Sequence, residues 1–119
     1  MFDKFDTWKY CDNANCWDYV RSWLIEKAGV PESDVPKFGI LPAEKKKMTT
    51  AHDIVKGKFV KCFRDQNAVA CQYIGNVLIH VGVVDGCYVR HTGREKGTTK
   101  EKFTDFEKIK TVYFKYANS

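Results

Sequence analysis

The sequence lacks a long hydrophobic run, an internal repeat, a low-complexity tract and a linker. Without an apolar stretch of membrane-helix length, we expect no transmembrane protein. The first residues include Asp3 and Asp6 and no apolar core, so we expect no secretory signal. The 119 residues are 44% hydrophobic and 14% aromatic, which argues against disorder. The sequence therefore predicts one globular domain over residues 1–119.

Cysteine occurs five times, an odd number, so at least one thiol must be unpaired within the chain. Free thiols in a reducing compartment fit this count better than a disulfide framework does. Four residues separate Cys11 from Cys16, which is wider than the usual zinc knuckle, and no second closely spaced pair exists. We therefore expect no metal site and no cofactor.

The formal net charge of +5 is modest, and much of it is local. The basic cluster consists of Lys45, Lys46, Lys47, Lys56, Lys58, Lys61 and Arg64. Such a cluster fits an anionic partner, either cell-wall polymer or nucleic acid, but a solvated face is the commoner explanation. The run has no interleaved aromatic platform for bases, so we expect no nucleic-acid partner.

The clearest predicted element is a helix that begins after Asn13 or Asn15 and ends near Gly29. Either asparagine can cap the helix, and glycine commonly ends one. Apolar residues recur at helical spacing, at Trp17, Val20, Leu24 and Ala28. Residues 31–47 indicate a loop, and residues 51–55 predict a second short helix.

After residue 67 the pattern changes to that of strands, with many β-branched residues. Strands are predicted over residues 68–74, 77–84, 87–91 and 108–116, with a polar loop over 92–105. Helices followed by a meander of strands indicate an α+β fold, with the N-terminal helix packed on a central antiparallel sheet.

The Asp-Gly pair at 85–86 is a strong hairpin signal. With these two residues as the loop, His80 lies directly opposite His91, and the two side chains share a face of the sheet. Gly82 lies on the same face and would leave room for another backbone or a substrate. The sequence therefore predicts that the two imidazoles touch.

The Gly-Asn pair at 75–76 is a second turn signal, and it places Cys71 opposite His80. Cys71 is then a neighbour of the same imidazole. Because it lies in mid-strand, away from a helix terminus, core packing is its more probable role. Cys62 and Cys87 are also interpreted as packing residues.

Cys16 stands where a polar loop turns into the first helix. At that position the peptide dipoles favour a thiolate, the reactive form of cysteine. In a cysteine–histidine pair, one imidazole acts as the base and a second orients it. His80 and His91 are the candidates for these two roles. The alternative is that Cys16 is a small buried hydrophobe, as most free cysteines are.

Three segments resemble the NlpC-type cell-wall cysteine peptidases: Asn15-Cys16-Trp17-x-x-Val20-Arg21, Ile79-His80-Val81-Gly82-Val83-Val84 and Val89-Arg90-His91-Thr92. The resemblance spans residues 10 to about 92. The tryptophan after the cysteine and the small single domain are most similar to the phage tail-associated members. The resemblance implies a papain-like arrangement of the α+β fold.

The resemblance also implies roles for individual residues. Cys16 matches the nucleophile, His80 the general base, and His91 the polar residue that orients the base. Tyr10 matches a tyrosine whose hydroxyl helps to bind the oxyanion, although its spacing from the cysteine is shortened. Asp18, followed by a tyrosine, replaces the family's glycine and aliphatic residue, which would alter the cleft or disfavour the thiolate.

The family cleaves peptide or amide bonds in peptidoglycan stem peptides through an acyl-enzyme intermediate. The resemblance implies the same activity here, with peptidoglycan peptides and phage tail proteins as partners, and neither nucleic acid nor membrane. The protein would be made in the host cytoplasm and act in the virion tail or at the cell wall. The alternatives are a catalytically inactive phage-tail or cell-envelope interaction module and a related amidase or acyltransferase.

Overall fold

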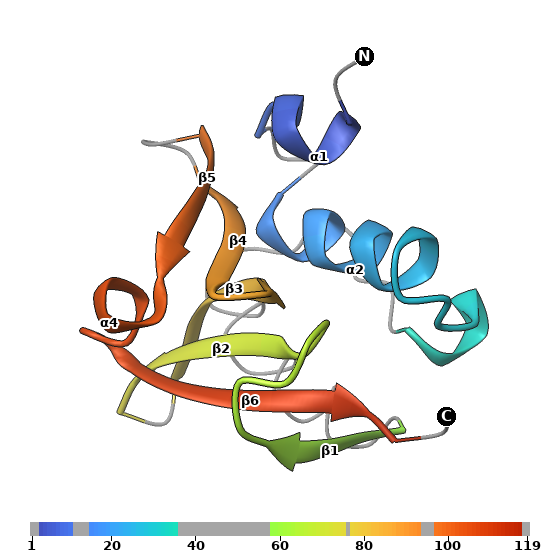
Figure 1. The fold of residues 1–119 in the computed structure, drawn as a ribbon. Helices are drawn as coiled ribbons and strands as arrows, with labels where there is room; N and C mark the ends of the chain where they lie inside the picture. Colours follow the sequence, from blue (N-terminus) through green and yellow to red (C-terminus); the bar gives the residue numbers. More distant parts are fainter. Residues whose placement is uncertain (1–2, 11–14, 36–57, 76, 94–96, 118–119) are drawn as a thin grey trace.

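The computed structural model describes residues 3–10, 15–35, 58–75, 77–93 and 97–117 (Figure 1). Its helices are α1 (Lys4–Thr7), α2 (Cys16–Glu26) and α4 (Phe103–Phe106), with a 3-10 helix η1 (Glu32–Asp34). Its strands are β1 (Phe59–Cys62), β2 (Val69–Ile74), β3 (Val77–Asp85), β4 (Tyr88–Gly93), β5 (Gly97–Lys102) and β6 (Lys110–Tyr116). Cys11, the helix predicted over 51–55 and most of the basic cluster lie outside the described residues.

The strands form one antiparallel sheet in the order β1-β6-β2-β3-β4-β5. β2 to β5 follow one another as a meander, and β6 returns to pair with both β1 and β2. The predicted α+β class with an antiparallel sheet is therefore confirmed.

Helix α2 begins where the sequence predicts, and Asn15 is its cap. The Asn15 side-chain oxygen accepts hydrogen bonds from the backbone N–H groups of Trp17 and Asp18, at 3.0 and 3.1 Å. The Asp18 carboxylate accepts one in return from the backbone N–H of Asn15, at 2.9 Å. This capping box satisfies N–H groups that a helix start leaves without partners. The helix ends before Gly29, whose φ of 71° is accessible to glycine.

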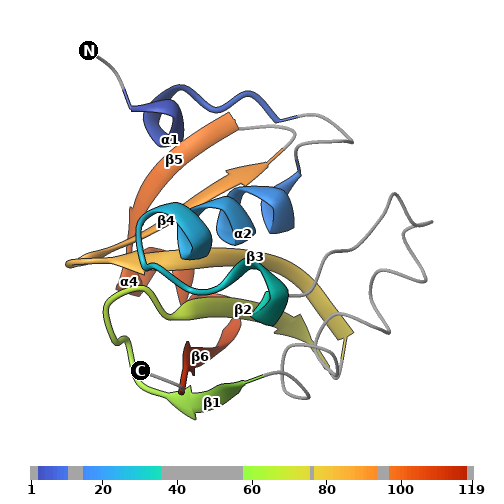
Figure 2. The ribbon, with the colours of Figure 1, turned by 90° about the vertical axis from the view of Figure 1, so that its right-hand side faces the viewer.

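Helices cover both faces of the sheet, with α2 in front of β3 and α4 behind it in Figure 2. On the α2 side, aromatic residues of α1 and α2 meet strand residues. The buried members of this α2-side cluster include Phe5, Trp17, Tyr19, Val20, Trp23, Leu24, Val69, Cys71, Val81 and Val83. The smaller α4-side cluster is formed by Ala68, Ala70, Val84, Val89, Phe106 and Tyr113.

The loop predicted over 92–105 is wrong, because β5 and α4 lie there. β5 is an edge strand with partly exposed side chains, so it needs no apolar face and carries little of the usual strand signal. β1 was not predicted either. Both edge strands of the sheet were therefore missed.

The turn between β3 and β4 differs from the prediction. Asp85 lies opposite Tyr88, so the two turn residues are Gly86 and Cys87. Relative to the predicted register, β4 is displaced by two residues along β3. A displacement of two residues keeps every side chain on its own face, so the two histidines still share one side. Cys87 is exposed at the turn, and its predicted packing role is wrong.

A β-bulge between β2 and β3 changes the position of Cys71. Cys71 lies opposite Val81, and Gln72 lies opposite His80, with the register shifting just after Gln72. The predicted pairing of Cys71 with His80 is therefore wrong. Because neighbouring residues of a strand point to opposite faces, Cys71 faces α2 and His80 faces α4.

Candidate active site

Two imidazoles meet on the α4 side of the sheet. Nε2 of His80, in β3, lies 2.9 Å from Nδ1 of His91, in β4, which is a hydrogen-bond distance. The rings are nearly perpendicular, at 81°, with their centroids 5.0 Å apart. The structure thus brings together the two histidines that the sequence pairs, although the register of the strands is not the predicted one.

A carboxylate extends this pair into a series of three residues. Nε2 of His91 lies 3.0 Å from Oε1 of Glu101, in β5. Glu101 lies opposite Val89, and Thr99 lies opposite His91, so Glu101 reaches the imidazole diagonally. Glu101 is not predicted as a site residue, because residues 92–105 have the composition of a polar loop. The two β-branched threonines at 98 and 99 were the weak signal for a strand there.

The imidazole pair packs against Phe106, with ring centroids 6.4 Å from His80 and 5.3 Å from His91. The side chain of Gln72 donates a hydrogen bond of 2.9 Å to the carbonyl oxygen of Phe106, which holds α4 against β2. Burial, together with the neighbouring His91, lowers the pKa of His80 to about 4. At neutral pH His80 is therefore uncharged, and one of its nitrogens can accept a proton.

Gly82 lets β3 and β4 approach closely beside the imidazoles. A Cβ atom at this position would lie 2.7 Å from Cγ1 of Val89, 2.8 Å from the carbonyl oxygen of Arg90 and 3.2 Å from Cβ of His91. Of the two predicted occupants of the space beside Gly82, another backbone or a substrate, the structure shows the backbone of β4. Past this point the two strands diverge (Figure 2), and the side chains of His80 and His91 connect them.

Cys16 is the first residue of α2 and is partly exposed. It packs against the α2-side cluster, and its thiol interacts electrostatically with that of Cys71. Burial, and to a smaller extent Cys16, raises the pKa of Cys71 far above its usual range. Cys71 is therefore an unreactive core residue, as predicted, whereas Cys16 keeps the favourable position at a helix start.

The thiol and the imidazole pair lie on different sides of β3. Cys16 packs in the cluster that contains Val81, and His80 precedes Val81 with its side chain toward α4. Cys71, which interacts electrostatically with Cys16, lies opposite Val81 on that α2 side. The N-terminal end of α2 lies in front of the diverging β3 and β4, and α2 contacts both strands (Figure 2).

The structure also places Tyr10, the predicted oxyanion residue, and Asp18, the departure from the family pattern. Tyr10 is partly exposed in the segment after α1, and its role at the oxyanion stays a prediction. The carboxylate of Asp18 is held in the capping box of α2 by the Asn15 backbone. The acidic departure from the family pattern therefore has a structural explanation, because it completes the cap of the helix that carries Cys16.

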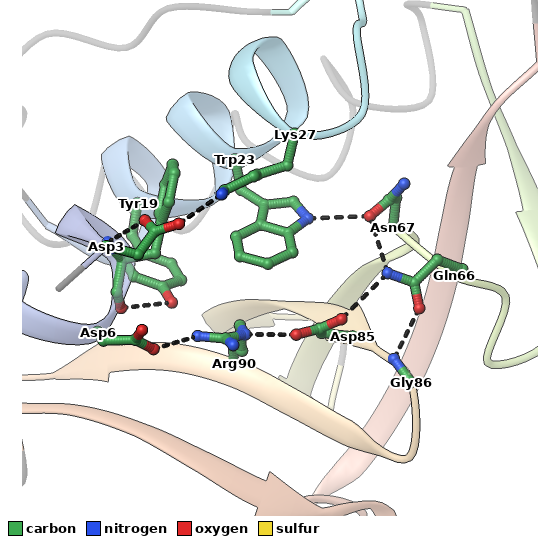
Figure 3. Close-up of polar contacts among 11 residues, drawn as sticks. Asp3, Asp6, Tyr19, Trp23, Lys27, Gln66, Asn67, Asp85, Gly86 and Arg90 are labelled. Atoms are coloured by element: carbon green, nitrogen blue, oxygen red, sulfur yellow. Dashed lines mark hydrogen bonds and ion pairs between the residues drawn. The ribbon is translucent and has the colours of Figure 1, made fainter. Parts of the chain in front are cut away.

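On the α2 side of β4, Arg90 forms the centre of a polar network (Figure 3). Its Nε donates to Asp85 at 2.7 Å, and one terminal nitrogen donates to Asp6 at 2.8 Å. Its guanidinium lies 5.0 Å from the ring centroid of Trp23. Burial lowers the pKa of Arg90, but the hydrogen bonds to Asp6 and Asp85 together raise it by more. The pKa of Arg90 therefore lies above its usual value. From the sequence, Arg90 has no expected role beyond its place in the resemblance.

Amide side chains connect the β3–β4 turn to α2. The Gln66 side chain accepts a hydrogen bond from the backbone N–H of Gly86 at 2.6 Å and donates one to Asp85 at 3.2 Å. Asn67 accepts a 3.0 Å hydrogen bond from the indole N–H of Trp23 (Figure 3). The network therefore fixes the helix on the sheet.

Within the described ranges, no group of three or more His, Cys, Asp or Glu side chains is arranged to hold a metal ion. In the same part of the chain, no helix is long and apolar enough to cross a membrane.

Comparisons of the chain with protein-family models, with curated proteins and with solved structures find no match. The resemblance to the NlpC-type peptidases therefore stays a prediction, and the family's activity enters below as a proposal.

Proposed function

We propose that this protein is a papain-like cysteine hydrolase that cleaves peptide or amide bonds in peptidoglycan stem peptides, in a phage or prophage tail. The observation that supports it most is the hydrogen-bonded series of His80, His91 and Glu101. Such a series is the means by which a nucleophile's base is oriented. The substrate class and the tail setting rest on the resemblance of the sequence to the NlpC-type peptidases.

His80 has the properties of a general base. Its Nε2 is engaged by His91, and its Nδ1 has no hydrogen-bond partner among the described residues. Burial keeps the ring neutral at pH 7, because it lowers the pKa of His80 to about 4. A thiolate beside the ring would favour the imidazolium and raise that pKa again. Nδ1 is therefore the nitrogen that would exchange a proton with the thiol.

Cys16 is the proposed nucleophile. Its sulfur attacks the carbonyl carbon of the substrate while Nδ1 of His80 takes the thiol proton. The backbone N–H of Cys16 and the hydroxyl of Tyr10 stabilise the oxyanion. The C–N bond breaks as His80 returns the proton to the leaving amine. Water then attacks the thioester while His80 takes a proton from that water. The C–S bond breaks to release the acid, and His80 returns the proton to the Cys16 sulfur.

This chemistry requires Cys16 and Nδ1 of His80 to come within hydrogen-bond reach. In the described arrangement Cys16 packs on the α2 side of β3, and the His80 ring lies on its α4 side. Catalysis therefore requires α2 to shift relative to β3 and β4, which diverge behind it (Figure 2), when substrate binds. Catalytic hydrogen bonds commonly tighten only when substrate is bound.

Digestion of purified peptidoglycan tests the proposal. We expect the protein to release stem-peptide fragments with new amino and carboxyl termini, identified by mass spectrometry. Cys16→Ser and His80→Ala should abolish release, whereas Cys87→Ser, which changes an exposed thiol at the distant turn, should not. If the unaltered protein releases no fragments from several peptidoglycan types, the proposed hydrolase activity is refuted.

A second candidate function is a catalytically inactive interaction module of a phage tail or cell envelope. The observation that favours it is the separation of Cys16 from the imidazoles by β3. The module predicts binding of peptidoglycan without new termini, and the same binding by Cys16→Ser. A sedimentation assay with insoluble peptidoglycan, followed by analysis of termini, distinguishes the two functions.

A further inference from the structure

The carboxylate of Glu101 is a part of the site that neither the composition nor the resemblance indicates. The side chains of His91 and Glu101 are 10% and 25% exposed, so their contact is largely screened from water. β5 places this carboxylate at the far end of the series from His80. Glu101 therefore cannot touch a substrate held at His80 and must act through His91.

Hydrogen-bond chemistry gives the series a direction. An ionised carboxylate only accepts hydrogen bonds, so Nε2 of His91 must be the donor to Glu101. A neutral His91 that carries its hydrogen on Nε2 has a lone pair on Nδ1. Nε2 of His80, which lies 2.9 Å from that lone pair, must then be a donor as well. A neutral His80 with its hydrogen on Nε2 has its lone pair on Nδ1.

We infer that Glu101 is a positioning residue that sets the tautomer of His80, through His91, so that Nδ1 becomes the basic nitrogen. The inference deepens the proposed function and rests on it for its catalytic meaning. When such a carboxylate is removed, the histidine can adopt the wrong tautomer, and the reaction rate then falls strongly. Here the effect is transmitted through a second imidazole.

The opposite arrangement is chemically defined, which makes the inference testable. An imidazolium at His91 would donate hydrogen bonds from both nitrogens. Nε2 of His80 would then accept, and the hydrogen of His80 would move to Nδ1. The tautomer of His80 therefore reports whether Glu101 directs the series or merely pairs with a charged His91.

Nitrogen-15 NMR of the imidazole rings at pH 7.5 measures this tautomer in the folded protein. We expect His80 in the wild type to be a single tautomer with its hydrogen on Nε2. Glu101→Leu should give a mixture of the two tautomers, and Glu101→Gln, whose amide can accept or donate, should give a smaller second population. Thr99→Val, which changes another polar side chain of β5 opposite His91, should leave the tautomer of His80 unchanged.

Two results would overturn the inference: a hydrogen on Nδ1 of His80 in the wild type, or an unchanged His80 tautomer in both Glu101 variants. The wild-type spectrum tests the predicted His80 tautomer even if Glu101→Leu fails to fold. No substrate is needed, so a wild type that shows the expected tautomer but releases no peptide refutes the proposed function alone. If the hydrolase is active, Glu101→Leu should lower kcat by at least about tenfold with little change in KM.

Discussion

Arg90 and His91 are consecutive residues of β4, yet they belong to two unlike polar regions. Arg90 faces α2, where two carboxylates and an indole ring surround its guanidinium (Figure 3). His91 faces α4, where it stands in the middle of a linear series between His80 and Glu101. In the Arg90 region every charge is paired, and the contacts connect β4 to the β3–β4 turn, to α1 and to α2. The other ends at a ring nitrogen with no hydrogen-bond partner among the described residues.

The difference leads us to interpret the Arg90 region as structural and the region of His80 and His91 as the candidate functional site. A network in which charges are paired and helices are joined to a turn stabilises the fold. A buried neutral imidazole whose second nitrogen makes no hydrogen bond does not stabilise the fold through that nitrogen. Titratable groups with strongly shifted pKa values concentrate at functional sites. Substitutions in the two regions should therefore affect different quantities.

Arg90→Met should give the largest loss of stability. The variant keeps an apolar stem but leaves Asp85, whose side chain is 32% exposed, without its cation. Breaking a buried ion pair on one side commonly costs about 3–5 kcal/mol, and the partial exposure of Asp85 places the expected cost at the lower end of this range. Urea denaturation followed by tryptophan fluorescence measures this change. Arg64→Met, at the more exposed pair with Glu107, is the control and should cost clearly less; an equal cost would contradict the structural role of the Arg90 network.

Stability should also depend on pH through His80. The pKa of His80 falls from 6.5 in the unfolded chain to about 4 in the fold, so the unfolded state binds more protons between these values. The free energy of unfolding should therefore decrease as pH falls from about 6.5 to about 4, by up to about 3 kcal/mol. The measurement is a series of urea titrations across this range. His80→Gln should flatten the dependence, and an unchanged slope in that variant would show that other groups cause it.

Gly82→Ala should separate β3 from β4 beside the imidazoles. The new methyl group would clash with Val89 and with the carbonyl of Arg90, at 2.7 and 2.8 Å. Overpacking of this kind costs about 1–3 kcal/mol. We expect a lower thermal midpoint and a changed NMR signal of His91. Gly93→Ala, at a position with open space around the new methyl group, is the control, and equal effects of both changes would contradict the close approach.

His91→Gln should have the smallest effect on stability, below about 1 kcal/mol, because a polar side chain of similar length stays between His80 and Glu101. The same variant should lose most of any peptide release. A stability loss as large as that of Arg90→Met would remove the contrast between the two faces of β4.

The central parts of this fold could be predicted from the sequence, and the edges could not. α2 was predicted from apolar spacing and an asparagine cap, and the inner strands from their β-branched residues, because both elements must bury a face. β5 buries little, so its sequence carries no apolar alternation. Glu101 was missed for this reason, although it belongs to the candidate site.

The histidine contact was predicted correctly from an incorrect register. The turn uses Gly86-Cys87 instead of Asp85-Gly86, and the two-residue displacement preserved the face. The bulge after Gln72 had the opposite consequence, because it separated Cys71 from His80. The Asp-Gly signal located the hairpin only to within one residue, and an extra residue further along a strand leaves no local signal.

The central claim is that the imidazole series activates Cys16, and the rate of thiol alkylation tests it most directly. Mass spectrometry can follow iodoacetamide modification of Cys16 and of Cys87, the exposed turn cysteine, in the same sample at pH 7. We expect Cys16 to react at least about tenfold faster than Cys87, and His80→Ala to remove this advantage. Equal rates for the two cysteines, or a fast Cys16 that is unaffected by His80→Ala, would contradict the account.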